Sequence, residues 1–163
     1  MASTYTPIAT TTVSSATQSV TFSSISSTYT DLVLIVSVWG LSGSDAFLRF
    51  NGDTGTNYSD TVARGNGTTG SSVRDSNAAG IDMGVVSTTG GIYTPMIFNI
   101  QSYSSTTLNK TVIGRISNGN SMVTALVGLW RSTAAINSVS LVERTSTGWQ
   151  PGSTFALYGI KAA

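Results

Sequence analysis

The residues of this chain that could do chemistry begin with a turn rich in oxygen ligands between Asn51 and Asp60. Its acidic and amide side chains lie next to closely spaced glycines, and carboxylate and amide oxygens are the groups that bind Ca²⁺ in proteins. The same residues are typical of a turn that ends a strand, because Asn and Asp bond to their own backbone and glycine adopts positive φ. We interpret the segment as such a turn, and we expect neither a metal nor a cofactor.

A second chemistry to consider is hydrolysis of a glycosidic bond, which needs two carboxyl groups across a cleft. The chain offers Glu143 and six Asp residues, and no pair stands out. It contains no His and no Cys, which excludes Ser-His-Asp triads, thiolate nucleophiles and the usual zinc sites. We expect Glu143 to form an ion pair with its neighbour Arg144 at a strand end, and we predict that the protein is not an enzyme.

The three tryptophans and the six tyrosines are candidates for a sugar-stacking platform, since aromatic faces bind the apolar faces of carbohydrates. Trp39 and Trp130 stand at the ends of apolar segments, where packing at the edge of the core is the better interpretation. Trp149 lies in a polar loop between Thr145 and Gly152. We predict that Trp149 is exposed and contacts either a glycan or another protein subunit.

These residues must be positioned by β-structure. Ser and Thr number 26 and 25 of the 163 residues, whereas 40% of the chain is hydrophobic, so a sizeable core with a hydroxyl-rich surface is expected. No segment has the apolar periodicity of a helix. Short apolar segments separated by turn residues predict strands at Tyr5–Val13, Ser19–Phe22, Asp31–Trp39, Asp45–Phe50, Thr94–Ile100, Thr111–Ser117, Met122–Arg131, Asn137–Glu143 and Thr154–Lys161.

Three of these segments carry finer predictions. Asp31–Trp39 is almost continuously apolar, as expected for a central strand covered on both faces. Ala46, Leu48 and Phe50 share one face and should point to the core, whereas Asp45, Phe47 and Arg49 share the other and should face water. The Asn-Gly pair in Ser117–Asn120 predicts a tight hairpin.

The stretch from residue 51 to 91 is rich in glycine and poor in apolar residues, so we predict long loops with short strands there. Within it, Arg64-Gly65-Asn66-Gly67 lacks the lysine of a phosphate-binding loop and is interpreted as a flexible loop.

The fold class that follows is all-β, a single antiparallel β-sandwich domain of the jelly-roll kind. We place the sandwich at residues 19–163. Residues 1–18 lack a core of their own and form either an edge strand or an N-terminal arm that packs on a neighbouring subunit.

Net charge limits the classes of partner. The formal charge is +1 and the Lys and Arg residues are not clustered, so nucleic acid and anionic membranes are not expected as partners. The apolar run at Asp31–Trp39 is also far shorter than the roughly 18 residues of a membrane-spanning helix.

Several motifs, taken together in this order, resemble a family of small virion proteins of tailed phages, including cyanophages. The resemblance extends from about residue 18 to the end of the chain and is carried by Val20–Ile25, Tyr29–Leu34, Leu48–Ser59, Val127–Ile136 and Ala156–Lys161. It implies a structural β-sandwich of the particle, namely a cement or decoration protein on the outside of the capsid. The implied partners are the major capsid protein and other copies of this chain, in a homotrimer at local threefold positions. Tail-associated proteins are also similar, so a tail-fibre, receptor-binding or carbohydrate-binding module remains the alternative, and a cellular surface lectin is a further one.

The interface residues follow from where such folds bind, since loops at one end of a sandwich and free arms are the usual contact sites. We predict contacts by the arm from Thr4 to Thr12 and by three loop residues, that is by Thr4, Tyr5, Thr6, Ile8, Arg64, Arg74 and Trp149.

Overall fold

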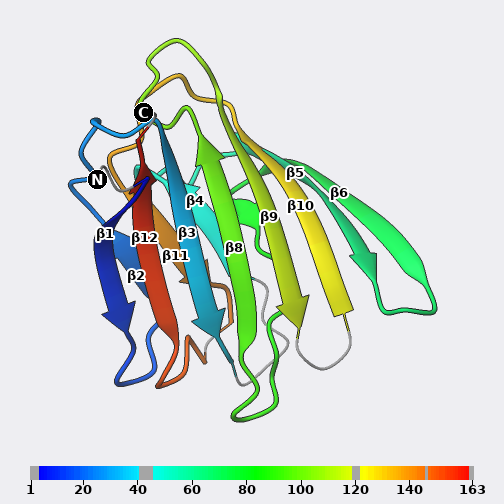
Figure 1. Ribbon diagram of the computed structural model, residues 1–163. Helices are drawn as coiled ribbons and strands as arrows, with labels where there is room; N and C mark the ends of the chain where they lie inside the picture. Colours follow the sequence, from blue (N-terminus) through cyan, green and yellow to red (C-terminus); the bar gives the residue numbers. More distant parts are fainter. Residues whose placement is uncertain (1–3, 41–45, 119–121, 146, 162–163) are drawn as a thin grey trace.

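The computed structural model describes residues 4–40, 46–118, 122–145 and 147–161. These residues form strands and no helix (Figure 1), so no helix long and apolar enough to cross a membrane is found among them. The strands are β1 (Tyr5–Thr12), β2 (Ser19–Phe22), β3 (Asp31–Val38), β4 (Ala46–Phe50), β5 (Tyr58–Gly65), β6 (Gly70–Ala78), β7 (Ile81–Asp82), β8 (Thr94–Gln101), β9 (Lys110–Asn118), β10 (Met122–Trp130), β11 (Val139–Glu143) and β12 (Thr154–Ile160).

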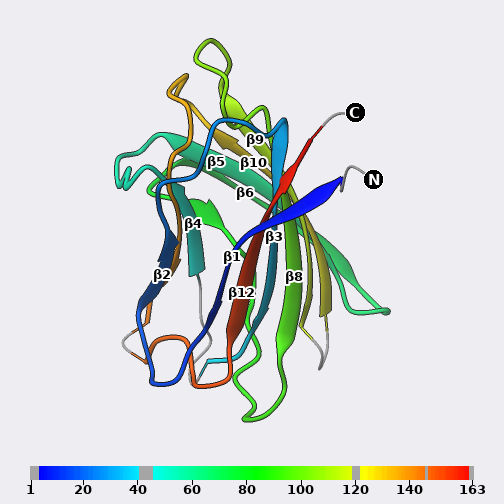
Figure 2. The same ribbon diagram turned by 60° about the vertical axis from the view of Figure 1, so that its left-hand side comes forward.

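The strands form two antiparallel sheets of unequal size. The larger has eight strands in the order β1-β12-β3-β8-β9-β10-β5-β6, and the smaller has four in the order β2-β11-β4-β7. Figure 2 shows the two sheets face to face, with β2 and β4 opposite β12, β3 and β8. The predicted all-β sandwich is confirmed.

The core lies between the sheets and follows the alternation of the strands. Side chains such as Leu34, Phe98 and Leu126 point inward from the large sheet and are buried. Ala46, Leu48 and Phe50 oppose them from the small sheet, so the predicted buried face of β4 is confirmed. Phe50 also packs on Trp130, with ring centroids 5.5 Å apart.

The central strand β3 differs from its prediction on one face. It lies between β12 and β8, and Leu32, Leu34, Val36 and Val38 of its inward face are buried. The opposite face is only partly covered, since Ile35 is exposed. The prediction of a strand covered on both faces was therefore wrong for this chain alone, because no second layer packs over Ile35.

The predicted long loops between residues 51 and 91 contain the β5–β6 hairpin instead. β5 pairs along its whole length with β10, and β6 pairs with β5. Every residue of β6 is exposed except Ala78, which is half-buried. An edge strand that buries almost nothing has no need of apolar alternation, and this is why the sequence did not reveal it.

At its N-terminal end the chain forms an edge strand rather than a free arm, because β1 pairs with β12 from Tyr5 to Thr12. The hairpin predicted at Ser117–Asn120 joins β9 to β10, which pair antiparallel in register from Met122 and Asn118 to Trp130 and Lys110. The turn residues 119–121 lie outside the described residues.

Candidate functional site

The largest unexplained feature of the molecule is the face of the eight-stranded sheet that points away from the small sheet, which we call the outer face. It consists of the strand residues that alternate with the buried ones. Four large apolar side chains are exposed on it, at 44% for Ile35, 49% for Ile113, 62% for Val123 and 59% for Val127. Their chain neighbours, such as Val112 and Leu126, are buried inside. The outer face is thus apolar in its centre and open to water.

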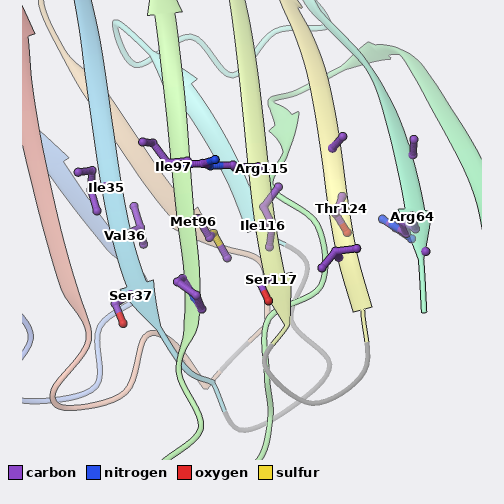
Figure 3. Close-up of a pocket in the computed structure, with 15 residues that line it drawn as sticks. Ile35, Val36, Ser37, Arg64, Met96, Ile97, Arg115, Ile116, Ser117 and Thr124 are labelled. Carbon is purple, nitrogen blue, oxygen red and sulfur yellow. The ribbon is translucent and has the colours of Figure 1, made fainter. Parts of the chain in front are cut away.

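A groove of about 730 Å³ crosses the outer face and runs over β3, β8, β9, β10 and β5 (Figure 3). On each of these strands it is lined by three consecutive residues, two of which point outward: Ile35–Ser37, Pro95–Ile97, Arg115–Ser117, Val123–Ala125 and Ala63–Gly65. A smaller hollow of about 230 Å³ adjoins it across β10, β5 and β6 and includes Val127 and Leu129. Concave, mainly apolar surfaces of this kind are the usual form of binding sites.

Arg115 is the outward-pointing charged side chain of this groove; Arg64 also lines it, but its guanidinium is directed to Asp82. Arg115 is exposed on β9, and Figure 3 shows its side chain reaching over β8 to Ile97. No hydrogen bond or ion pair engages its guanidinium within the described ranges of the chain. Arg74, on β6 opposite Thr61, lies on the same face. Asp31 is the one carboxyl group among the described strand residues of this face, and it already accepts a hydrogen bond from the Ser102 backbone at 2.7 Å.

The predicted interface residues of the N-terminal segment lie on or next to β1. Tyr5 is exposed and packs its ring edge-on against Tyr158, with centroids 6.5 Å apart. Thr6 and Ile8 are half-buried, and the carbonyl of Thr4 accepts a hydrogen bond from the backbone of Lys161. These residues form one edge of the large sheet and stay predictions as contacts.

Arg64 and Arg74 were predicted in loops, and the structure places both on the strands of the β5–β6 hairpin. Arg64 points inward, where its guanidinium lies 3.5 Å from a carboxylate oxygen of Asp82. Arg74 points outward and is exposed. The two side chains therefore lie on opposite faces of the sheet and do not form one contact site.

Trp149 was predicted to be an exposed contact residue, and this prediction was wrong. The indole is fully buried, packs edge-on against Phe155 at 5.7 Å and donates a hydrogen bond from Nε1 to the carbonyl of Leu141. The loop turns inward because Trp149 forms a bridge with Thr17 through two backbone hydrogen bonds. The sequence analysis missed that Trp149 belongs to the core because its neighbours in the chain are polar.

The turn after β4 is held together by its own backbone geometry and hydrogen bonds. Asn51 and Gly52 have positive φ values of 53° and 68°, and the carboxylate of Asp53 accepts hydrogen bonds from the Gly55 backbone, Asn57 and Trp130. The bond from Trp130 Nε1 is the largest cause of a lowered pKa for Asp53. Across the described residues no cluster of three metal-binding side chains is found.

Glu143 is buried and holds the loop that follows it. Its carboxylate accepts hydrogen bonds from the hydroxyl of Thr145 and, at 3.1 Å, from the backbone of Gly148. Glu143 is not the solvated group at a strand end that was predicted, since its side chain is buried and points into the protein, while Arg144 lies over the ring of Phe47 at 4.4 Å. Both carboxylate oxygens are thus occupied in fixing a loop.

Two further ionisable groups are buried between the sheets. Burial raises the pKa of Asp60 to about 6, and the carboxylates of Asp82 and Asp75 raise it further, whereas a hydrogen bond from the Asp82 backbone opposes the shift. Lys110 is fully buried, its Nζ bonded to the carbonyls of Leu108 and Thr133, and burial lowers its pKa. Each of these side chains joins segments distant in the sequence.

Comparison with known proteins finds no family model, no curated protein and no solved structure that matches this chain.

Proposed function

We propose that this chain is a structural virion protein of a tailed phage. In this proposal it is a decoration protein that binds the outside of the head as a homotrimer and stabilises contacts between capsomers. The observation that carries the proposal is the open apolar outer face of the large sheet. Contiguous apolar patches of this kind on a rigid scaffold are typical of protein interaction sites. The motifs that resemble virion proteins suggest that the assembly is a phage particle.

The roles of the buried polar groups support a structural protein. Asp53 fixes the turn after β4, Glu143 fixes the loop before Trp149, and Lys110 joins two loops. These side chains use their polar atoms to hold the sandwich in one shape. A rigid sandwich presents a fixed surface, as a protein that reinforces a shell requires.

The proposal is tested by the copy number of the protein in purified phage particles. Quantitative mass spectrometry gives its ratio to the major capsid protein. Near parity, with hundreds of copies per particle, is the expected result. A handful of copies would assign the protein to the tail, and absence from the particle would overturn the proposal altogether.

The carbohydrate-binding alternative depended mainly on Trp149 as an exposed aromatic residue. Trp149 is buried, Trp130 is buried against Tyr58 at 6.2 Å, and Trp39 is half-buried with its Nε1 bonded to the Pro151 carbonyl. A stacking platform needs an exposed ring face. None of the three tryptophans offers such a face, and the exposed aromatic rings among the described residues are those of Tyr5 and Tyr93.

A further inference from the structure

We propose that the outer face is the docking surface of this protein, and that its occupant is an apolar protein surface carrying a carboxylate opposite Arg115. The inference rests on the proposed function only for the identity of the partner as a protein of the particle. Its chemical content, an apolar surface with one acidic group, comes from the side chains of the groove itself.

The apolar part of the argument is the contrast between the two faces of the same strands. Val112 is fully buried and its neighbour Ile113 is about half exposed, and the same contrast separates Leu126 from Val127. Polar residues on the outer face would serve equally well if water were its only contact, as they do on β6. The aliphatic side chains instead favour a surface that is covered in the assembled state.

The charged residues of the outer face indicate which charge a partner should carry. Arg115 and Arg74 are the basic groups among the described strand residues of this face, and the one carboxyl group among them, Asp31, accepts a hydrogen bond on Oδ1 from the Ser102 backbone. A second copy of the chain placed with the same face against this one would bring two more arginines and a single carboxylate, Asp31, whose Oδ1 is already engaged by the Ser102 backbone. A partner with a carboxylate supplies the charge-assisted, bidentate hydrogen bonds that an Arg side chain is suited to make.

The position of Arg115 adds a requirement on the partner. Figure 3 shows Ile35 and Ile97 on one side of it, over β3 and β8. On the other side Ala125 of β10 is its direct pairing partner, and Val123 of the same strand also lines the groove. The groove crosses five strands, which at the usual spacing is about 19 Å. The acidic group of the partner must therefore have apolar groups on both sides of it, as on a protein surface and unlike the end of a single hydrocarbon chain.

The first experiment measures copies per particle for phage carrying variants of this protein. Val123→Lys, Val127→Lys and Arg115→Gln should each lower the copy number at least tenfold. Arg115→Lys keeps the positive charge but loses the paired donors, so its copy number should lie between those of Arg115→Gln and the wild type. Leu108→Lys is the matched control, because Leu108 is comparably exposed at 56% in a loop away from the outer face. Thermal unfolding of the purified variants verifies that all of them fold.

The outcomes separate this inference from the proposed function. If the wild-type protein is present in the particle and the outer-face variants have the same copy number, the inference is overturned and the proposed function stands. If wild-type protein is absent from the particle, the proposed function fails and the face is tested with two dyes of the same ring system. These are anionic 1-anilinonaphthalene-8-sulfonate and its uncharged analogue N-phenyl-1-naphthylamine.

The dye experiment compares the affinity of the isolated protein for the anionic dye with its affinity for the uncharged dye. We expect the anionic dye to bind about tenfold more tightly than the uncharged one, which is the worth of one charge-assisted hydrogen bond. Arg115→Gln should abolish this preference, and Val123→Lys should weaken binding of the uncharged dye. Equal binding of both dyes to the wild type, or dye binding that Val123→Lys leaves unchanged, would overturn the inference.

Sedimentation velocity decides whether a second copy is the occupant instead. The oligomeric state of the wild type should be the same as that of Val127→Lys. Dissociation of a wild-type oligomer by Val127→Lys would identify the outer face as a self-contact and overturn the assignment of a different partner.

Discussion

Asp60 is a carboxyl group placed between the two sheets, on the inward face of β5, where it accepts a hydrogen bond from the Asp82 backbone at 3.0 Å. Its pKa of about 6 lies above the ordinary value of 3.8. The folded protein therefore binds this proton more tightly than the unfolded chain does. The stabilisation is fully present below pH 4 and is lost as the pH rises through about 6.

Replacement of Asp60 by Asn should remove this dependence on pH, because an amide keeps an oxygen for the Asp82 backbone and carries no charge. At pH 7.5 the variant should be more stable than the wild type by up to about 3 kcal/mol. The difference should vanish near pH 4. Urea unfolding from pH 4 to pH 8 measures it, and a wild-type stability that stays flat over that range would contradict the assignment.

Trp149 gives the second prediction at this scale, since its indole fills the core. Trp149→Ala should lower the free energy of unfolding by about 3–5 kcal/mol, from the lost burial and the cavity that remains. Val123→Ala, at an exposed position, should change it by less than about 0.5 kcal/mol. Urea unfolding followed by circular dichroism compares the two variants, and similar stabilities would show that the indole is not packed as described.

At the scale of the elements, two inward-facing glycines leave room in the core for bulky side chains of other strands. A Cβ atom on Gly114 of β9 would lie 2.7 Å from the ring of Phe98, and one on Gly128 of β10 would lie 2.8 Å from Ile81. Phe98 and Ile81 thus occupy the space that side chains at these positions would need. The glycines fix how closely β8 and β7 pack on the neighbouring strands.

Gly114→Ala should therefore destabilise the protein by about 1–3 kcal/mol through overpacking. Gly70→Ala is the control, because its Cβ would approach only the carbonyl of Arg64, at 3.7 Å, and its φ is not positive. Thermal unfolding of both variants measures the difference. A melting temperature for Gly114→Ala equal to that of the control would mean that Phe98 moves aside without cost.

At the scale of the whole molecule, the four-stranded sheet covers only part of the eight-stranded one. Val73 of β6 pairs with the buried Val62 yet is itself exposed, so the inward side of β6 has no cover. The hairpin extends beyond the core, as Figure 2 also shows. Stability should consequently vary across the large sheet.

Native-state hydrogen exchange should reveal this gradient. The backbone amides of β6 should exchange faster than those of β9, because β6 pairs on one side only and buries almost no apolar surface. Mass spectrometry of peptides from the two strands gives the comparison. Equal protection of β6 and β9 would imply that the free edge of β6 is covered, for example by another copy.

The sequence by itself determined the fold class and most of the strands, because apolar alternation records which face of a strand is buried. Ser19–Phe22, Thr94–Gln101 and Thr154–Ile160 lie within a residue of their predicted limits. The Asn51-Gly52 turn followed from residue types that tolerate positive φ. These features depend on local backbone preferences and on a single buried face.

Only the tertiary structure decided what surrounds each residue. β6 is a strand because β5 pairs with it, Trp149 is buried because its loop bridges to Thr17, and Ile35 is exposed because no layer covers that side of β3. The groove with Arg115 at its centre gathers residues of five strands that span positions 35 to 125 of the chain. Contacts of this kind arise from the arrangement of the sheets, which no local pattern of residues encodes.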